Sequence, residues 1–220
     1  MPHQLAYHNA TRLDVAALLP AFSEKILEIG CGTGATLNFL KSSGRCSWVG
    51  GVEIAPAAQA LAAQSLDRCW CGNVETLDLG LPEGDLDVVL CPDVLEHLVD
   101  PWAAIGRLVT LLKPGGILIA SLPNIRNYKV SLGLLLNGKW EYQDAGILDR
   151  THLRFFVRET AVELLTRGGL RVDLVAPVLA LKTWRLKWML NAASGGRLTD
   201  LYATQYLVRG VKPSTHQSGP

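Results

Sequence analysis

The chain has 220 residues, of which 49% are hydrophobic, and its formal net charge is +1. This length suits one α/β domain with a modest addition, and the hydrophobic content excludes a disordered chain except at the ends. The near-zero charge argues against the broad electrostatic surface that nucleic acids or anionic membranes attract. We therefore expect a globular protein with no nucleic-acid partner.

The cysteines and the chain ends indicate a reducing compartment. The five cysteines are odd in number, and their spacing fits neither a disulfide framework nor a zinc site. The N-terminal stretch MPHQLAYHNATRLD lacks the basic and apolar regions of a secretion signal, and no apolar run reaches the roughly 18 residues of a membrane span. We expect a cytoplasmic protein without a membrane span, ending in a flexible polar tail at 211–220.

Short apolar runs alternate with amphipathic stretches along the first half of the chain. The runs are rich in Ile, Val and Leu, as expected of strands covered on both faces. The last helical pattern of this half stops at Lys113-Pro114-Gly115-Gly116, which reads as a helix end followed by a turn. The predicted strands are 25–30, 48–53, 68–72, 86–91 and 117–122, and the predicted helices are 35–43, 56–66 and 101–113. Such strand–helix–strand repeats predict βαβ units and a parallel sheet.

The pattern changes after Leu122. Residues 123–152 contain Pro, Asn, Gly, Trp and Tyr with one helical stretch at 129–140, and an insertion of this kind is usually a lid or a substrate-binding element. Residues 181–191 form a basic amphipathic stretch, which we interpret as a helix that packs Trp184 and Trp188 on the core rather than as a membrane or partner site. The remaining predicted elements are a helix at 158–169 and strands at 170–178 and 201–210.

The sequence LEIGCGTGA at 27–35 carries the first functional signal. A strand that enters a glycine-rich turn and opens a helix lets a ligand approach bare backbone, and this spacing also fits the dinucleotide fingerprint. Glu28 precedes the glycines, where it is unfavourable beside a pyrophosphate and favourable beside a cation. Glu53 ends the second predicted strand and could accept both hydroxyls of a ribose. These residues alone leave open NAD and the cationic, phosphate-free S-adenosylmethionine.

Motifs downstream decide between the two ligands. LEIGCGTG, VGGVEI, DLDVVLCPDVLEHL and LKPGG occur in this order, and together they resemble the class I S-adenosylmethionine-dependent methyltransferases over residues 5–175. The resemblance implies that the glycines line the methionine and ribose, that Glu53 binds the ribose, and that Asp93 borders the methionine end. Tyr7 would fold over the cofactor as an aromatic cover. The implied cofactor site comprises Glu28, Gly30, Gly32, Gly34, Glu53, Asn73, Val74 and Asp93.

Asn73 departs from the family pattern, which often has an aspartate at this position beside the adenine. An amide can still accept a hydrogen bond from the adenine amino group, but without charge assistance. We therefore expect cofactor binding that is retained but weaker.

The resemblance completes the predicted fold and domain organisation. We expect an α/β, Rossmann-like, doubly wound sheet of seven strands, mainly parallel with the last strand antiparallel. Residues 1–210 would form a single methyltransferase domain in which 123–152 is an acceptor-binding lid after the fifth strand.

Two histidines are candidate catalytic bases. His97 follows a predicted strand at its carboxyl end, where open α/β sheets place ligands, and His152 ends the predicted lid. The alternatives are a structural histidine that caps a short helix for His97, and a loop histidine bound to Asp149 or backbone for His152. Arg150 and Arg154 flank His152 as phosphate-binding or merely solvated cations, and the lid aromatics Tyr128, Trp140 and Tyr142 could stack on an acceptor or form the lid's own core.

A divalent metal is a further hypothesis for the same residues. Asp93, Glu96 and His97 are similar to the Glu-x-x-Glu-His pattern that binds Mg²⁺ in ubiquinone-pathway and small-RNA O-methyltransferases, and His152 could converge on them. The first acid is shorter here and is also assigned to the cofactor, so we do not favour a metal.

The predicted function is methyl transfer from S-adenosylmethionine to a hydroxyl of a small-molecule or sugar acceptor. The stretches SLPN, KWEYQDAG and LDRTHLRFF resemble a bacterial subgroup associated with polysaccharide and glycan clusters. The alternatives are a methyltransferase acting on a quinol or on a nitrogen atom, and a non-catalytic cofactor-binding partner subunit. The sequence does not indicate an oligomeric state.

Overall fold

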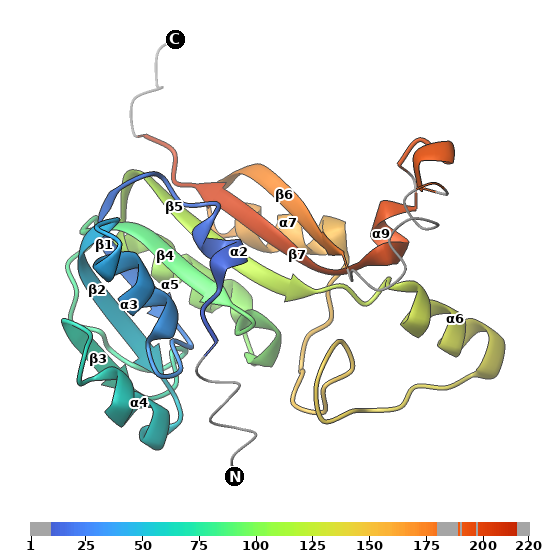
Figure 1. The fold of residues 1–220 in the computed structure, drawn as a ribbon, viewed down its shortest axis with the longest axis horizontal. Helices are drawn as coiled ribbons and strands as arrows, with labels where there is room; N and C mark the ends of the chain where they lie inside the picture. Colours follow the sequence, from blue (N-terminus) through green and yellow to red (C-terminus); the bar gives the residue numbers. More distant parts are fainter. Residues whose placement is uncertain (1–9, 180–188, 190, 197, 215–220) are drawn as a thin grey trace.

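The computed structural model describes residues 10–179, 189, 191–196 and 198–214, and these residues form one seven-stranded sheet (Figure 1). The strand order is β3-β2-β1-β4-β5-β7-β6, and β7 is antiparallel to both of its neighbours while the other paired strands are parallel. The predicted fold class and the antiparallel last strand are thus confirmed. The strands are β1 (Ser23–Ile29), β2 (Cys46–Glu53), β3 (Arg68–Cys71), β4 (Leu86–Pro92), β5 (Leu112–Pro123), β6 (Arg171–Leu179) and β7 (Ala203–Val211).

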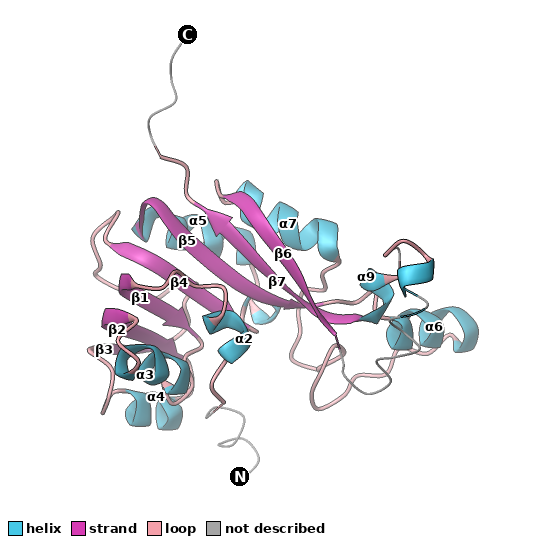
Figure 2. Ribbon diagram, turned by 45° about the horizontal axis from the view of Figure 1, so that its top comes forward, coloured by secondary structure: helices cyan, strands magenta, loops and turns pink. Residues whose placement is uncertain are grey.

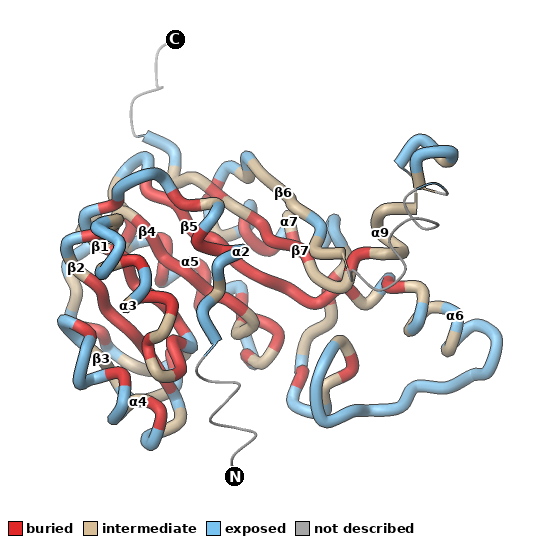
Figure 3. Tube along the Cα trace, viewed as in Figure 1, coloured by how far each residue is buried: buried red, intermediate tan, exposed pale blue. Residues whose placement is uncertain are grey.

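Helices cover both faces of the sheet and enclose two separate cores (Figure 2). On one face Val15, Leu37 and Leu40 pack in a cluster with β1 and β2, and on the other Ile105 and Leu164 pack in the larger cluster. The central strands are therefore buried on both sides, which explains their continuous apolar sequences (Figure 3). The helices are α2 (Leu13–Ala16), α3 (Ala35–Ser42), α4 (Pro56–Ala62), α5 (Pro101–Leu111), α6 (Tyr128–Asn137), α7 (Arg158–Arg167) and α9 (Thr199–Tyr202), with a 3₁₀ helix η1 at Leu95–His97.

The predicted turn at 113–116 is a bulge inside β5. α5 ends at Leu111, and the strand pairs Leu112 with Leu86 and then Ile117 with Val88, so the residues between them loop out of the ladder. Gly115 has φ of +79°, and a Cβ at Gly116 would lie 2.9 Å from a backbone oxygen, so both positions require glycine.

The chain end differs from the expected tail. β7 includes Val211, and Lys212 exchanges backbone hydrogen bonds with the bulge and donates from Nζ to carbonyls at the end of α5. Of the predicted tail at 211–220, Val211 therefore pairs within β7 and Lys212 caps α5. Residues 215–220, Tyr7, and the 181–188 part of the amphipathic stretch lie outside the described residues. Among the helices that the structure describes, none is long and apolar enough to cross a membrane.

The segment after β5 leaves the sheet and returns to it. α6 projects away from the sheet, and a long loop leads back from it (Figure 1). Asn124 and Phe156 form an isolated bridge at the two ends of this segment, and the amides of Leu153 and Arg154 donate to the carbonyl of Glu96 at 2.8 and 3.0 Å. These bonds bring the last part of the predicted lid beside the residues that follow β4.

Candidate active site at the carboxyl ends of the strands

The glycine loop folds over the carboxyl end of β2. Gly30, Gly32 and Gly34 have φ of +72°, +56° and +82°, which side chains other than glycine rarely adopt. A Cβ on Gly30 would lie 2.4 Å from the Val94 side chain, and the Gly30 amide donates to the carbonyl of Val52 at 2.7 Å. The three glycines therefore present close-packed backbone at the edge where open α/β sheets bind ligands.

Glu53 ties this loop to the end of β2. Its buried carboxylate accepts from the Gly32 amide and from the Ala55 amide, each at 2.8 Å. Each carboxylate oxygen keeps capacity for a further hydrogen bond, so the residue can still accept from two ribose hydroxyls.

Glu28 lies in β1 beneath the loop with only 3% of its surface exposed. Its Oε2 has no hydrogen-bond partner among the described residues. Burial raises the pKa of this carboxyl to about 8, the positive charge of Arg12 opposes that rise, and the negative charge of Glu53 adds to it. A buried carboxyl with an unpartnered oxygen at this position is chemically suited to a cationic ligand.

Asp93 follows β4 in a strained backbone conformation, with φ of +54°. Its carboxylate accepts from the Ser121 hydroxyl at 2.7 Å, from the Gln205 amide at 2.8 Å and from the Arg12 guanidinium in a short ion pair. Sequence reasoning missed Arg12, because this contact joins residues 81 positions apart and no local pattern marks it.

Asn73 and Val74 form the turn after β3, on the same edge as Glu53. Gly72 connects the two, since its amide donates to the carbonyl of Glu53 at 3.0 Å. The side-chain oxygen of Asn73 accepts from the Glu75 amide at 2.9 Å, so here the amide side chain shapes the turn. Val74 is buried in the larger core cluster.

The two predicted histidines lie in contact, with ring centroids 4.8 Å apart. His152 Nδ1 lies 3.1 Å from the carbonyl of Ile147, and His97 Nδ1 lies 3.2 Å from the carbonyl of Thr151. A carbonyl can only accept, so each ring donates from Nδ1, and in its neutral form each keeps a lone pair on Nε2. His152 Nε2 lies 4.0 Å from Oε1 of Glu96.

Glu96 is the buried acid of this cluster. Only 1% of the residue is exposed, and neither carboxyl oxygen has a hydrogen-bond partner among the described residues. Burial and the negative charge of Asp93 raise its pKa well above the usual range, while burial lowers the pKa of His152. Both shifts favour the neutral forms, in which His152 can accept a proton.

The four-residue metal set of the sequence hypothesis is not assembled as such. One ligand atom from each of Glu96, His97 and His152 lies within 4.8 Å of the other two, and Asp93 is not part of this group. Asp93 instead faces Arg12 and Gln205. The cluster that remains has the donor chemistry of a three-residue cation site, in which each histidine gives its other N–H to a carbonyl.

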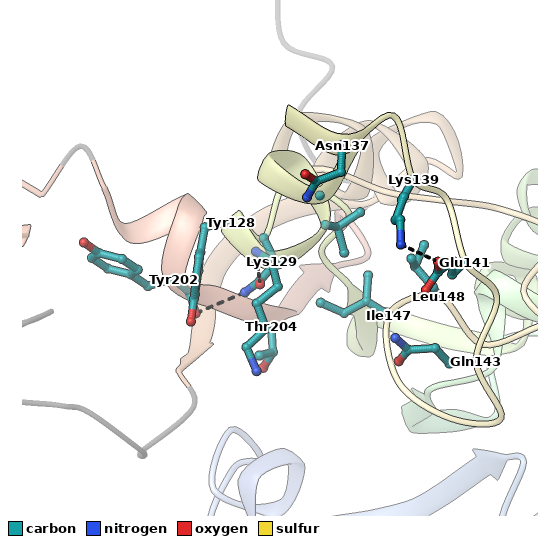
Figure 4. Close-up of a pocket in the computed structure, with 13 residues that line it drawn as sticks. Tyr128, Lys129, Asn137, Lys139, Glu141, Gln143, Ile147, Leu148, Tyr202 and Thr204 are labelled. Atoms are coloured by element: carbon teal, nitrogen blue, oxygen red, sulfur yellow. Dashed lines mark hydrogen bonds and ion pairs between the residues drawn. The ribbon is translucent and has the colours of Figure 1, made fainter. Parts of the chain in front are cut away.

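A cavity of about 520 Å³ lies between α6 and the loop that follows it (Figure 4). Its wall is mostly apolar, and Ile147, whose carbonyl holds His152, is part of that wall. Figure 4 shows the ion pair between Lys139 and Glu141 on the loop side of the cavity. The lining includes Tyr128, Lys129, Gly133, Gln143, Leu148 and Tyr202.

The other lid residues have structural contacts. Trp140 packs edge-to-face on Phe155 and Tyr142, which favours the lid-core interpretation of these aromatics. Arg150 pairs with Asp144 at 2.6 Å, and Arg154 donates to the carbonyl of Val99. All five cysteines carry free thiols, as expected.

Known proteins share both the sequence pattern and the fold. A family model described as a methyltransferase domain matches residues 1–175. The ubiquinone biosynthesis O-methyltransferase of Albidiferax ferrireducens is 29% identical, covering 92% of this chain and 80% of its own, and that of Cereibacter sphaeroides is 30% identical over 91% and 78%. A methyltransferase structure from Archaeoglobus fulgidus matches the fold with a TM-score of 0.67 at 18% identity, covering 96% of this chain and 98% of its own. The chain therefore belongs to the class I S-adenosylmethionine-dependent methyltransferases, and S-adenosylmethionine is its cofactor.

Proposed function

We propose that this enzyme transfers a methyl group to a hydroxyl of a small-molecule acceptor. The observation that carries the proposal is the pair of imidazoles at the carboxyl end of β4, whose Nε2 lone pairs are free to accept a proton. A hydroxyl nucleophile must lose its proton during methyl transfer, whereas a nitrogen with a lone pair need not. The curated relatives carry the name O-methyltransferase, which supports the same chemistry.

The cofactor residues keep their predicted roles in this proposal. When bound, S-adenosylmethionine supplies an electrophilic methyl group. Glu53 would accept from the ribose hydroxyls, and Glu28 would face the cationic end, consistent with its unpartnered buried oxygen. Arg12, which pairs with Asp93, would bind the carboxylate of the methionine moiety.

The acceptor would occupy the cavity under α6, on whose wall Ile147 adjoins His152. Ile147 supports this placement, because it lines the cavity and its backbone carbonyl accepts from His152 Nδ1. The names of the relatives favour a quinol or another phenolic hydroxyl as the acceptor. A sugar hydroxyl rests on the motif resemblance alone, so both classes belong in the test.

The test is transfer of a labelled methyl group to a panel of phenols, quinols and glycans. We expect turnover with one hydroxyl class, and a fall of about a hundredfold or more in kcat in His152→Ala and His97→Ala. Normal binding of S-adenosylhomocysteine by both variants is the control. Full turnover in the double variant would favour a nitrogen acceptor, and stoichiometric capture of a partner without turnover would favour the partner-subunit alternative.

A divalent cation at Glu96, His97 and His152 is the second candidate for activating the acceptor, and the close approach of three ligand atoms favours it. The ion would lower the pKa of a nearby hydroxyl, and the three side chains would orient it. Dialysis against a chelator separates the candidates. Turnover that survives chelation supports the imidazole base, while loss of turnover restored by Mg²⁺ or Mn²⁺ supports the cation.

A further inference from the structure

The guanidinium of Arg107, in α5, donates hydrogen bonds to three backbone carbonyls of the turn that follows β3. Its Nη1 donates to Val74 O at 3.3 Å and to Glu75 O in a shorter contact, and its Nη2 donates to Leu77 O at 2.7 Å. A planar guanidinium holds several acceptors in one fixed geometry, which the single ammonium of lysine does not reproduce. The side chain therefore fixes both the place and the orientation of this turn.

The hydrogen bonds within the turn at 73–77 centre on Asn73, whose side-chain oxygen also accepts from the Glu75 amide. The Asn73 carbonyl accepts from the amides of Thr76 and Leu77 at 3.1 and 2.9 Å, which closes one turn of helical type. A single turn orders several residues for few hydrogen bonds and is unstable in isolation. Arg107 satisfies the carbonyls of Val74, Glu75 and Leu77, which these bonds leave unpaired.

A second connection joins the same turn to the start of α5. The Glu75 carboxylate accepts from the Asp100 amide at 2.8 Å, and Asp100 in turn caps α5 by accepting from the Ala103 amide at 3.0 Å. At its other end the turn begins beside Glu53, through the amide of Gly72. The turn is thus held on one side by α5 and on the other by the end of β2 at Glu53.

We propose that Arg107 is a positioning residue for adenine binding. It holds Asn73 and Val74 at the distance from Glu53 that the adenosine part of the cofactor spans, without touching the cofactor. The proposal rests on the proposed placement of the adenine beside Asn73 and Val74. Preorganising the turn saves the free energy of ordering it when the ligand binds.

The experiment is calorimetric titration of the full chain with two probes. S-adenosylhomocysteine carries the amino-acid end and the adenosine part, whereas 5′-methylthioadenosine keeps the adenosine part and the sulfur but lacks the amino-acid end. Arg107→Met removes all donors, and Arg107→Lys keeps one charged donor group. Arg45→Met is the matched control, because Arg45 also donates to two loop carbonyls, Leu19 O and Pro20 O at 3.3 and 3.0 Å, but at the amino ends of the strands.

We expect Arg107→Met to bind both probes about tenfold more weakly, in line with the loss of a preorganised turn. Arg107→Lys should recover part of the affinity, and Arg45→Met should bind as the wild type does. Wild-type affinity in Arg107→Met, or an equal loss in Arg45→Met, would overturn the proposal. A loss confined to S-adenosylhomocysteine would show instead that the turn does not face the adenine, and a wild type that binds neither probe would refute the proposed cofactor residues themselves.

Discussion

At the scale of single residues, we expect Glu28 to lower the stability of the fold and to strengthen cofactor binding. Its pKa of about 8 in the folded chain lies above the ordinary 4.5, so the unfolded chain releases this proton first and the free energy of unfolding falls as the pH rises from about 4.5 to 8. Glu28→Gln avoids this penalty. We expect the variant to be more stable than the wild type by about 2–4 kcal/mol at pH 8 and to gain little near pH 4.5.

The same substitution removes the carboxyl group whose ionised form would face the cationic end of the cofactor. We expect Glu28→Gln to bind S-adenosylmethionine about tenfold more weakly despite its higher stability. Urea unfolding at several pH values and calorimetric titration measure the two effects separately. Unfolding free energies that run parallel to those of the wild type at every pH would contradict this view of Glu28.

Thr151 is a second test at this scale. Its hydroxyl donates to Asp149 at 2.6 Å and lies 3.1 Å from His97 Nδ1, so its oxygen accepts from that ring. We expect Thr151→Val to lower kcat about tenfold, because His97 then loses one of the two groups that hold its tautomer, while Thr151→Ser keeps the rate. Nitrogen NMR of His97 reads the tautomer directly. An unchanged tautomer and rate in Thr151→Val would show that the Thr151 hydroxyl has no positioning role.

At the scale of elements, α6 is an exposed helix that forms one wall of the cavity. Every residue of this helix is at least partly exposed, and Gly133 lines the cavity with open space around the position of a Cβ. We expect Gly133→Phe to fill the cavity, raise the acceptor KM at least about tenfold, and leave S-adenosylhomocysteine affinity unchanged. The fold should tolerate the change, since glycine is a poor helix former.

Leu135→Phe is the matched control, because it adds a ring to the same helix at a position that is 78% exposed. Gly133→Ala, which adds a single methyl group, should give an intermediate KM. An acceptor KM that stays the same in Gly133→Phe would place the acceptor elsewhere.

At the scale of the whole molecule, the sheet was predictable because short stretches of sequence determine its strands. Buried parallel strands are continuous apolar runs, and the glycine loop and the acids at 28 and 53 are encoded within one βαβ unit. The bulge at 113–116 was not predictable from its sequence, since a turn and a bulge use the same residues and only the pairing with Leu86 and Val88 distinguishes them.

The site was predictable in part for the same reason. His97 and Glu96 follow a strand, where ligands bind, whereas the approach of His152 depends on backbone bonds from 153–154 to Glu96 across the fold. The contact of Arg12 with Asp93, the three carbonyls held by Arg107 and the cavity under α6 also join distant segments. Such contacts form only in the tertiary structure, so no local sequence pattern predicts them.

The most direct test of the account is calorimetric titration of the full chain with S-adenosylhomocysteine, beside Glu53→Ala. We expect saturable binding with one site per chain, and an affinity at least about tenfold lower in Glu53→Ala, which loses the acid proposed to accept from both ribose hydroxyls. Absence of binding by the wild type, or equal binding by both proteins, would contradict the claim that this edge holds the cofactor.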